Sequence, residues 1–363
     1  MEFKDKEEHI VVDPDFYDLS NSYQPDDFQS QTESLASKIY RGVIENGRRY
    51  QAIREGKYWA PADERQFESL EAGHLVCVVM DSESQNSLFY SPIEDPKRIL
   101  DIGTGRGSWA VDAADMFPKS VVRGVDLYPP PLDWMPPNCL LEVDDILQEW
   151  TWRDPFDLIH LRLGLGSYTL SEWDNLYKQA YDNLEPGGWF EQYEGGCEIL
   201  CDDGSLPKDS ILHVWGSRLY NASAKGGRPV DVIPIMRRGI ERAGFVDVHD
   251  KSYKFPIGAW PKDPVLKEAG RLNHHMWKVG MDGYAMHLLT NFGDPEPWTH
   301  DEVQVYVAKA RAELCNPKYH IYHVWRRVWG RKPTEDELAA QAESEGEKSP
   351  PPEAYPLSPQ SQA

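Results

Sequence analysis

Between residues 97 and 194, short apolar runs alternate with longer amphipathic stretches. Apolar runs bounded by turn residues are typical of buried strands, and apolar positions three or four apart are typical of helices. The pattern predicts strands at 98–101, 121–126, 139–144, 156–160 and 189–194, and helices at 108–117 and 172–184. This alternation predicts an α/β fold, a doubly wound parallel sheet with helices on both faces and a ligand crevice at the carboxyl ends of its strands.

The segment before this core shows helical spacing. Apolar side chains at Leu35, Ile39, Val43 and Ile44 follow one another at helical intervals, and a second helix is predicted from about 63 to 80. We therefore expect a helical cap over residues 29–96. Residues 1–28 are acidic and without period, and we expect a flexible arm there.

After the core region, 97–256, aromatic residues become frequent. A broken helical stretch is predicted at 210–243, two closing strands at 245–248 and 252–255, and a C-terminal helical segment at 257–331. The basic group at its end, made of Arg326, Arg327, Arg331 and Lys332, fits a solvated helix end. Residues 332–363 are rich in Glu, Ser, Ala and Pro, and we expect a disordered tail.

Charge and cysteine usage narrow the classes of function. The 363 residues carry a net charge of 38 − 60 = −22, which disfavours nucleic acid as a partner. No apolar run is long enough to span a bilayer, so we expect no membrane partner. Five cysteines without regular spacing favour reduced thiols in the cytoplasm or, alternatively, the nucleus, and we expect no metal site.

A glycine-rich turn follows the first predicted strand. Residues 101–107 read D-x-G-x-G-x-G, and glycines there let the backbone approach a ligand closely. A dinucleotide fingerprint, G-x-G-x-x-G, requires glycine where Ser108 stands, which argues against a nicotinamide oxidoreductase. The acid at Asp101 suits a ligand with a cationic group rather than a pyrophosphate.

Further acids stand at the ends of the next two strands. Asp126 is placed to accept hydrogen bonds from both hydroxyls of a ribose. Asp144 and Asp145 are placed to accept from an exocyclic amine such as that of adenine. The turn sequence at 184–188 then precedes the fifth strand, so four signals fall in register at predicted strand edges.

With these motifs the sequence resembles the class I S-adenosylmethionine-dependent methyltransferases, and more narrowly the fungal LaeA-like methyltransferases. The narrower resemblance covers about residues 35–330 and rests on the residues at 48–50, 55–58, 156–160, 179–181 and 184–191. It implies a seven-stranded, Rossmann-like methyltransferase sheet with helical N-terminal and C-terminal additions. It also implies S-adenosylmethionine as the cofactor.

The resemblance also implies residue roles. Asp101, Gly103, Gly105 and Gly107 would line the methionine part of the cofactor, Asp126 would bind the ribose, and Asp145 or its neighbour Asp144 would bind the adenine. Residues 160–162 would face the methionine end, with His160 as the candidate general base or, alternatively, a structural residue. Tyr50 and Tyr58 would cover the cofactor from the N-terminal segment, unless they serve only in packing.

The implied reaction is in-line methyl transfer, which proximity accelerates and for which a general base is optional. We expect a small-molecule acceptor belonging to secondary metabolism. The alternative is a nuclear regulator that acts through a protein partner. We expect the acceptor pocket between residues 50–59 and the aromatic-rich stretch 215–298, with Tyr58 and Trp277 as wall residues.

Overall fold

The computed structural model describes residues 42–340 except 83, 85 and 129–134. Its central sheet has the strand order β5-β4-β3-β6-β7-β10, with β9 on the outer edge of β10. The strands are β3 (Arg98–Ile102), β4 (Val121–Asp126), β5 (Cys139–Val143), β6 (Phe156–Arg162), β7 (Leu184–Gly195), β9 (Val246–Ile257) and β10 (Ile321–Arg331). β3 to β7 run parallel, and β10 is antiparallel to β7 and β9. Their number matches the seven-stranded sheet that the resemblance implied, and the two-residue β8 (Leu200–Cys201) makes eight by pairing with β10.

Helices cover both faces of the sheet, which confirms the doubly wound prediction. Neighbouring residues of β3 and β6 point to opposite faces, as they must in a strand. Ile99 and Leu158 pack in one cluster with α3 (Ser108–Met116). Leu100 and Ile159 pack in another with α4 (Leu170–Asp182) and α6 (Met236–Arg242).

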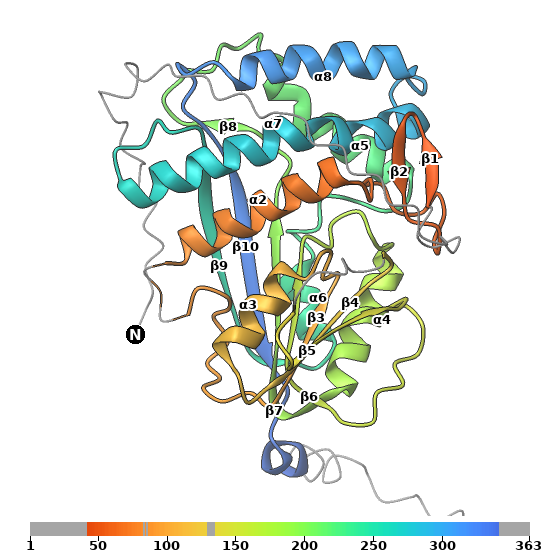
Figure 1. The fold of residues 1–363 in the computed structure, drawn as a ribbon, viewed down its shortest axis with the longest axis vertical. Coiled ribbons are helices and arrows are strands. Elements are labelled where there is room, and N and C mark those ends of the chain that lie inside the picture. Colours follow the sequence, from red (N-terminus) through yellow and green to blue (C-terminus); the bar gives the residue numbers. More distant parts are fainter. Residues whose placement is uncertain (1–41, 83, 85, 129–134, 341–363) are drawn as a thin grey trace, which may run out of the picture.

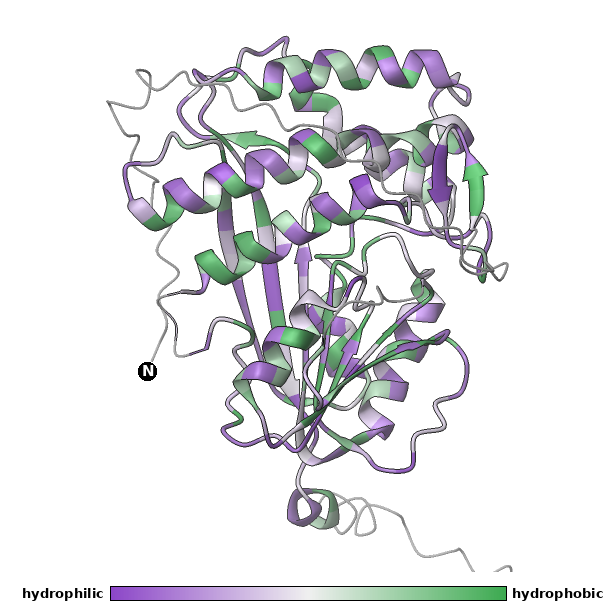
Figure 2. Ribbon diagram, in the orientation of Figure 1, coloured by the Kyte–Doolittle hydropathy of each residue, from purple (hydrophilic) through white to green (hydrophobic). Residues whose placement is uncertain are grey.

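A helical layer lies over one end of the sheet (Figure 1). In it α2 (Glu64–Met80) packs on the long helix α7 (Pro264–Phe292), which also contacts α5 (Trp215–Lys225) and α8 (His300–Leu314). A short 3-10 helix, η2 (Ile211–Val214), precedes α5. Green and purple residues alternate along α7 and α8 in Figure 2, as expected of helices with one buried face. The predicted helix at 63–80 is confirmed as α2, with Asp63 as its N-cap.

The residues just before α2 depart from the predicted helix. β1 (Val43–Glu45) and β2 (Arg48–Tyr50) form an antiparallel hairpin. Its turn residues, Asn46 and Gly47, have φ of 50° and 74°, as a type I′ turn requires. The helix predicted through Val43 and Ile44 is therefore wrong there. Leu35, Ile39 and the arm 1–28 lie outside the described residues.

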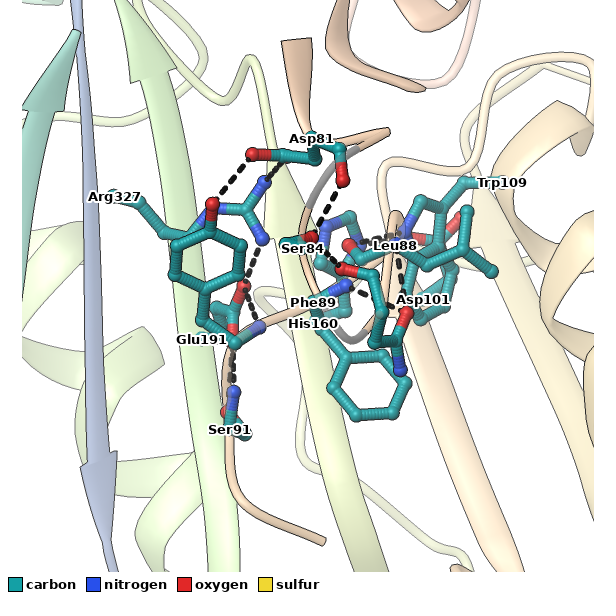
Figure 3. A network of polar contacts seen from close by, with 12 residues as sticks. Asp81, Ser84, Leu88, Phe89, Ser91, Asp101, Trp109, His160, Glu191 and Arg327 are labelled. Carbon is teal, nitrogen blue, oxygen red and sulfur yellow. Dashed lines mark hydrogen bonds and ion pairs between the residues drawn. The ribbon is translucent and has the colours of Figure 1, made fainter. Parts of the chain in front are cut away.

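The prediction that 257–331 is helical is wrong for its last part. Residues 321–331 form β10, which is hydrogen-bonded along both edges, to β7 on one side and to β9 on the other. The two strands predicted at 245–248 and 252–255 are one strand, β9. Arg327, expected on a solvated helix end, is 1% exposed. It forms ion pairs with Asp81 and Glu191, two acids that lie far from it in the sequence (Figure 3).

The predicted tail is ordered where the structure describes it. The backbone N–H of Lys332 donates to the carbonyl of Gly188 at 2.8 Å, and residues 335–340 are helical. The side chain of Glu337 pairs with Arg331 at 2.7 Å. The expectation of disorder is thus wrong for 332–340, and residues 341–363 lie outside the described part of the chain.

Candidate active site

A cleft of about 170 Å³ lies at the carboxyl ends of β3 to β6, where the fold predicts a ligand. Its floor is formed by the turns after β3, β4, β5 and β6. Its cover is formed by residues 51–62, between β2 and α2, and by the first half of α2. The cleft is therefore closed by the N-terminal segment and not by the sheet alone.

The glycine turn after β3 leaves room for a ligand. Gly103 and Gly105 line the cleft with φ of 69° and 58°, and no atom lies within 4 Å of where a Cβ would stand on either. A side chain there would be strained and would project into open space. Gly107, with φ of 89°, does not line the cleft, and a Cβ on it would meet the Leu141 side chain at 2.5 Å.

Asp126 is held beside this turn. Its carboxylate accepts from the backbone N–H of Gly105 at 2.9 Å and from that of Tyr128 at 3.0 Å. Burial nevertheless raises the pKa of Asp126 above its usual value. The carboxylate lines the cleft, so it is oriented toward any ligand that reaches the end of β4.

Asp144 and Asp145 line the cleft at the end of β5. The Asp144 carboxylate accepts from the backbone N–H of Asp145 at 2.8 Å. The Asp145 carboxylate accepts from the backbone N–H of Leu147 at 3.1 Å and lies 3.5 Å from Nε of Arg54 in the cover. Arg54 also pairs with Glu172 of α4 at 3.2 Å, so the cover is tied to the sheet domain at this end.

Asp101 and His160 come together beneath the cleft and not in it. The Nδ1 of His160 lies 2.8 Å from the Asp101 carboxylate, and its ring stacks on Trp109 at 3.8 Å (Figure 3). Both residues are almost fully buried, and neither is among the residues that line the cleft. Burial also lowers the pKa of His160, which fits a structural residue better than a general base.

The two tyrosines expected to cover the cofactor lie in different places, and only Tyr58 lines the cleft. Tyr58 lines the cleft, and burial raises its pKa far above the usual value, so its hydroxyl stays neutral. Tyr50 is buried against His287 of α7, with ring centroids 5.7 Å apart, and does not line the cleft. Beside Tyr58, Nε1 of Trp59 donates to the carbonyl of Leu165 at 2.8 Å and so joins the cover to the loop after β6.

A second, inner chamber of about 60 Å³ adjoins the cleft. Tyr58, Leu70 and Leu163 line both cavities. Much of the chamber's remaining wall is aromatic and comes from α5, α7 and β10, with Trp215, Trp277, Tyr284 and Trp325 among its residues, and residues 195–197 at the end of β7 also line it. The two wall residues expected from the sequence, Tyr58 and Trp277, are thus brought together, while the contribution of β10 was not foreseen.

Glu194 is a site residue that the sequence analysis missed. It is fully buried on β7, and its carboxylate accepts from the backbone N–H groups of Gly164 and Leu165 at 3.0 and 3.3 Å. Burial raises its pKa to about 7. This contact fixes the loop after β6 whose residue Leu163 lines both cavities. A glutamate inside an apolar strand that follows the turn at 184–188 was the available signal.

Within the described part of the chain, no cluster of three His, Cys, Asp or Glu side chains has an arrangement that fits a metal ion. No helix there is both long and apolar enough to cross a membrane. The five cysteines are unpaired.

Comparison with known proteins finds methyltransferases and regulators of secondary metabolism among the relatives of this chain. Residues 82–248 match a family model described as a methyltransferase domain. Methyltransferase pytC of Aspergillus terreus is 35% identical over 85% of this chain and 93% of its own length. The secondary metabolism regulator LAE1 of Cochliobolus heterostrophus is 35% identical over 78% of this chain and 93% of its own. Protein-methionine methyltransferase laeA of Emericella nidulans is 32% identical over 80% of this chain and 76% of its own.

Proposed function

The chain belongs to the family of S-adenosylmethionine-dependent methyltransferases that includes pytC and the LaeA-like proteins, and we propose that it methylates a small-molecule acceptor of secondary metabolism. One observation carries the proposal. A cleft lined in part by carboxylates and an apolar chamber meet at a common wall formed by Tyr58, Leu70 and Leu163. A transferase needs two such adjoining sites, one for the donor and one for the acceptor.

The residues of the cleft fit the cofactor. The space over Gly103 and Gly105 accommodates the methionine portion, and Asp126 accepts from the ribose hydroxyls. Asp145, or Asp144 beside it, accepts from the adenine amine. Asp101 and Gly107 support this arrangement from behind, since one is buried against His160 and the other packs on Leu141.

The chemistry asks the chain mainly to align two reactants. When bound, S-adenosylmethionine supplies a methyl group that its sulfonium already activates. Tyr58 lines both cavities, and its neutral hydroxyl can donate a hydrogen bond to a reactant. Proximity then accounts for most of the acceleration.

His323 is the one imidazole among the described residues that line the chamber. Burial lowers its pKa to about 4, and its Nε2 accepts from Nε1 of Trp325 at 3.0 Å. The His323 ring is therefore neutral, and its Nε2 is already hydrogen-bonded to Trp325, so we expect no general base from it. The rate of transfer then depends on the nucleophilicity of the acceptor itself. A chamber of about 60 Å³ is smaller than a cavity of about 150 Å³ that holds a benzene ring, so it admits only a small group, and its walls favour an apolar one.

Binding is tested by calorimetry with S-adenosylmethionine, S-adenosylhomocysteine and NAD. We expect the first two to bind and NAD to give no heat. Binding of NAD without any response to the other two would refute the proposal.

Transfer is tested with S-adenosylmethionine labelled at its methyl group, incubated with fungal metabolite extract and, separately, with fungal protein extract. We expect label in the small-molecule fraction. Label confined to protein would support the alternative, a nuclear regulator that acts through a protein partner; two of the relatives are named secondary metabolism regulators. In either case the unpaired cysteines support a reducing compartment, the cytoplasm or the nucleus.

The acceptor site is tested with Tyr58→Phe and Trp277→Ala. We expect both to lower turnover, because both side chains line the inner chamber, and we expect Trp277→Ala to retain cofactor affinity, because Trp277 does not line the cleft. Tyr306→Ala is the matched control, since this aromatic residue is buried beside Trp215 without lining the chamber. It should lower the melting temperature and leave the specific activity of the folded fraction unchanged.

A further inference from the structure

Arg162, the last residue of β6, is a half-buried cation that lines the cleft. Its Nη2 donates to Nδ1 of His74 at 2.9 Å. Among the residues that the structure describes, no carboxylate forms an ion pair with it. A guanidinium held partly out of water without a counter-ion is costly, so the site favours an anionic group on whatever fills the cleft.

The other cations of the cleft are in a different position. Arg54 pairs with Asp145 and Glu172. Arg106 pairs with Glu64 at 2.6 Å, near the surface. Lys57 is exposed to solvent. Arg162 is therefore the cleft cation that is both withdrawn from water and open to a new partner.

His74 holds Arg162 in one orientation. Burial lowers the pKa of His74, so its ring is neutral and has one donor and one acceptor nitrogen. Because arginine can only donate, Nδ1 of His74 accepts from Arg162, and Nε2 donates to the Asp112 carboxylate at 2.9 Å. The chain Asp112–His74–Arg162 thus leads from α3 through α2 to the cleft.

The order of the strands says which part of a ligand Arg162 meets. The cleft residues follow the sequence Asp145 on the β5 side, Asp126 on β4, the glycine turn on β3 and Arg162 on β6. With adenine at β5 and ribose at β4, the amino-acid end of the cofactor lies between β3 and β6. We propose that Arg162, positioned by His74, binds the carboxylate of the cofactor's methionine portion. This inference rests on the proposed function.

The test compares two ligands that differ only by this carboxylate, S-adenosylmethionine and decarboxylated S-adenosylmethionine, by calorimetry on the full chain. The wild type should prefer the carboxylated ligand by about 10- to 100-fold, the scale of a charged hydrogen bond. Arg162→Met should lose this preference, with the affinity for the decarboxylated ligand changed by less than about twofold. Arg162→Lys should keep part of it, because the charge remains.

Two further variants sharpen the test. His74→Phe removes the acceptor that orients Arg162, so it should reduce the preference without abolishing it. Arg106→Met removes a cleft arginine that has its own acidic partner, and it should keep the wild-type preference. Circular dichroism checks that each variant is folded. If Arg162→Met does not fold, the preference for the carboxylated ligand is compared between the wild type and Arg162→Lys.

The outcomes separate the two levels of the argument. If the wild type binds S-adenosylmethionine and Arg162→Met weakens both ligands equally, or neither, Arg162 does not bind the carboxylate and the proposed function stands. Loss of the preference in Arg106→Met and not in the Arg162 variants would assign the carboxylate to Arg106. If the wild type binds neither ligand, the proposed function fails and this inference with it.

Discussion

Two arginines of the same sheet, Arg162 on β6 and Arg327 on β10, differ in whether acidic side chains of the protein neutralise their charge. Arg327 is 1% exposed, donates to Glu191 at 2.8 Å and pairs with Asp81 (Figure 3). Its guanidinium carbon lies 4.1 Å from the ring centre of Tyr193. Arg162 has a neutral imidazole as its neighbour and an open cleft in front of it. One charge is matched inside the protein, and the other is left for a ligand to match.

The difference separates a structural network from a binding site. Asp81 is the C-cap of α2, Glu191 lies on β7, and Arg327 lies on β10, so the ion pairs join the helical layer to two strands of the sheet. Glu191 also accepts from the backbone N–H of Ser91 at 2.9 Å. The network's contacts are made within the chain, so its loss should cost stability. The polar groups of the cleft are open to a ligand, so the loss of one of them should weaken ligand binding.

The largest effect should follow from breaking the buried network. Arg327→Met leaves two carboxylates buried without their cation, and we expect a loss of about 3–5 kcal/mol in the free energy of unfolding. Urea denaturation measures it. The triple variant in which Asp81 and Glu191 also become apolar should recover much of this loss. A stable Arg327→Met protein that fails only to bind cofactor would erase the distinction between the two arginines.

Asp126→Ala should affect binding by a smaller amount and leave the fold in place. We expect cofactor affinity to fall by about 1.5–3 kcal/mol, the scale of a charged hydrogen bond. Gly105→Val should do at least as much harm, because a side chain would enter the space above the turn. Calorimetry checks both. Unchanged affinity in either variant would move the cofactor away from the ends of β3 and β4.

The same contrast explains what the sequence could reveal. The strands, the glycine turn and Asp126 were predictable because strand periodicity and turn chemistry are local. The hairpin at 43–50 was also within reach, since Asn46-Gly47 is a strong hairpin signal that the helical spacing concealed. Strand β10 could not be predicted in this way. A run that contains Arg326, Arg327 and Arg331 is typical of an exposed segment when the acidic partners of these arginines are unknown.

Those partners are distant in the chain. Arg327 and Asp81 are 246 residues apart, and Arg162 and His74 are 88 apart. Burial of a charge depends on such contacts, and a single sequence does not show them. For the same reason Asp101 and His160 were expected in the cleft, whereas their mutual hydrogen bond holds them beneath it.

Glu194 offers an intermediate case, a buried carboxylate that holds a loop of the site. Its pKa is raised from 4.5 to about 7 by burial, so the folded state favours the protonated form. The resulting stability is complete below about pH 4.5, falls as the pH rises and is lost above about 7, by an amount of roughly 3 kcal/mol. Glu194→Gln should remove this slope, measured by urea denaturation between pH 5 and pH 8. An identical slope in the variant would assign it to other groups.

The smallest effect should come from Arg331, four residues beyond Arg327 on the same strand. Its guanidinium pairs with Asp247 at 2.6 Å and with Glu337 at 2.7 Å, so on paper it is as well matched as Arg327. Both acids, however, are about half exposed, with 55% and 45% of their side chains in contact with solvent. Water would solvate them after the arginine is removed, so Arg331→Ala should cost less than about 1 kcal/mol. Urea denaturation of this variant beside Arg327→Met tests whether burial, rather than the number of ion pairs, sets the cost. Equal losses in the two variants would show that pairing alone decides it, and the contrast between matched and open arginines would then have to rest on cofactor binding.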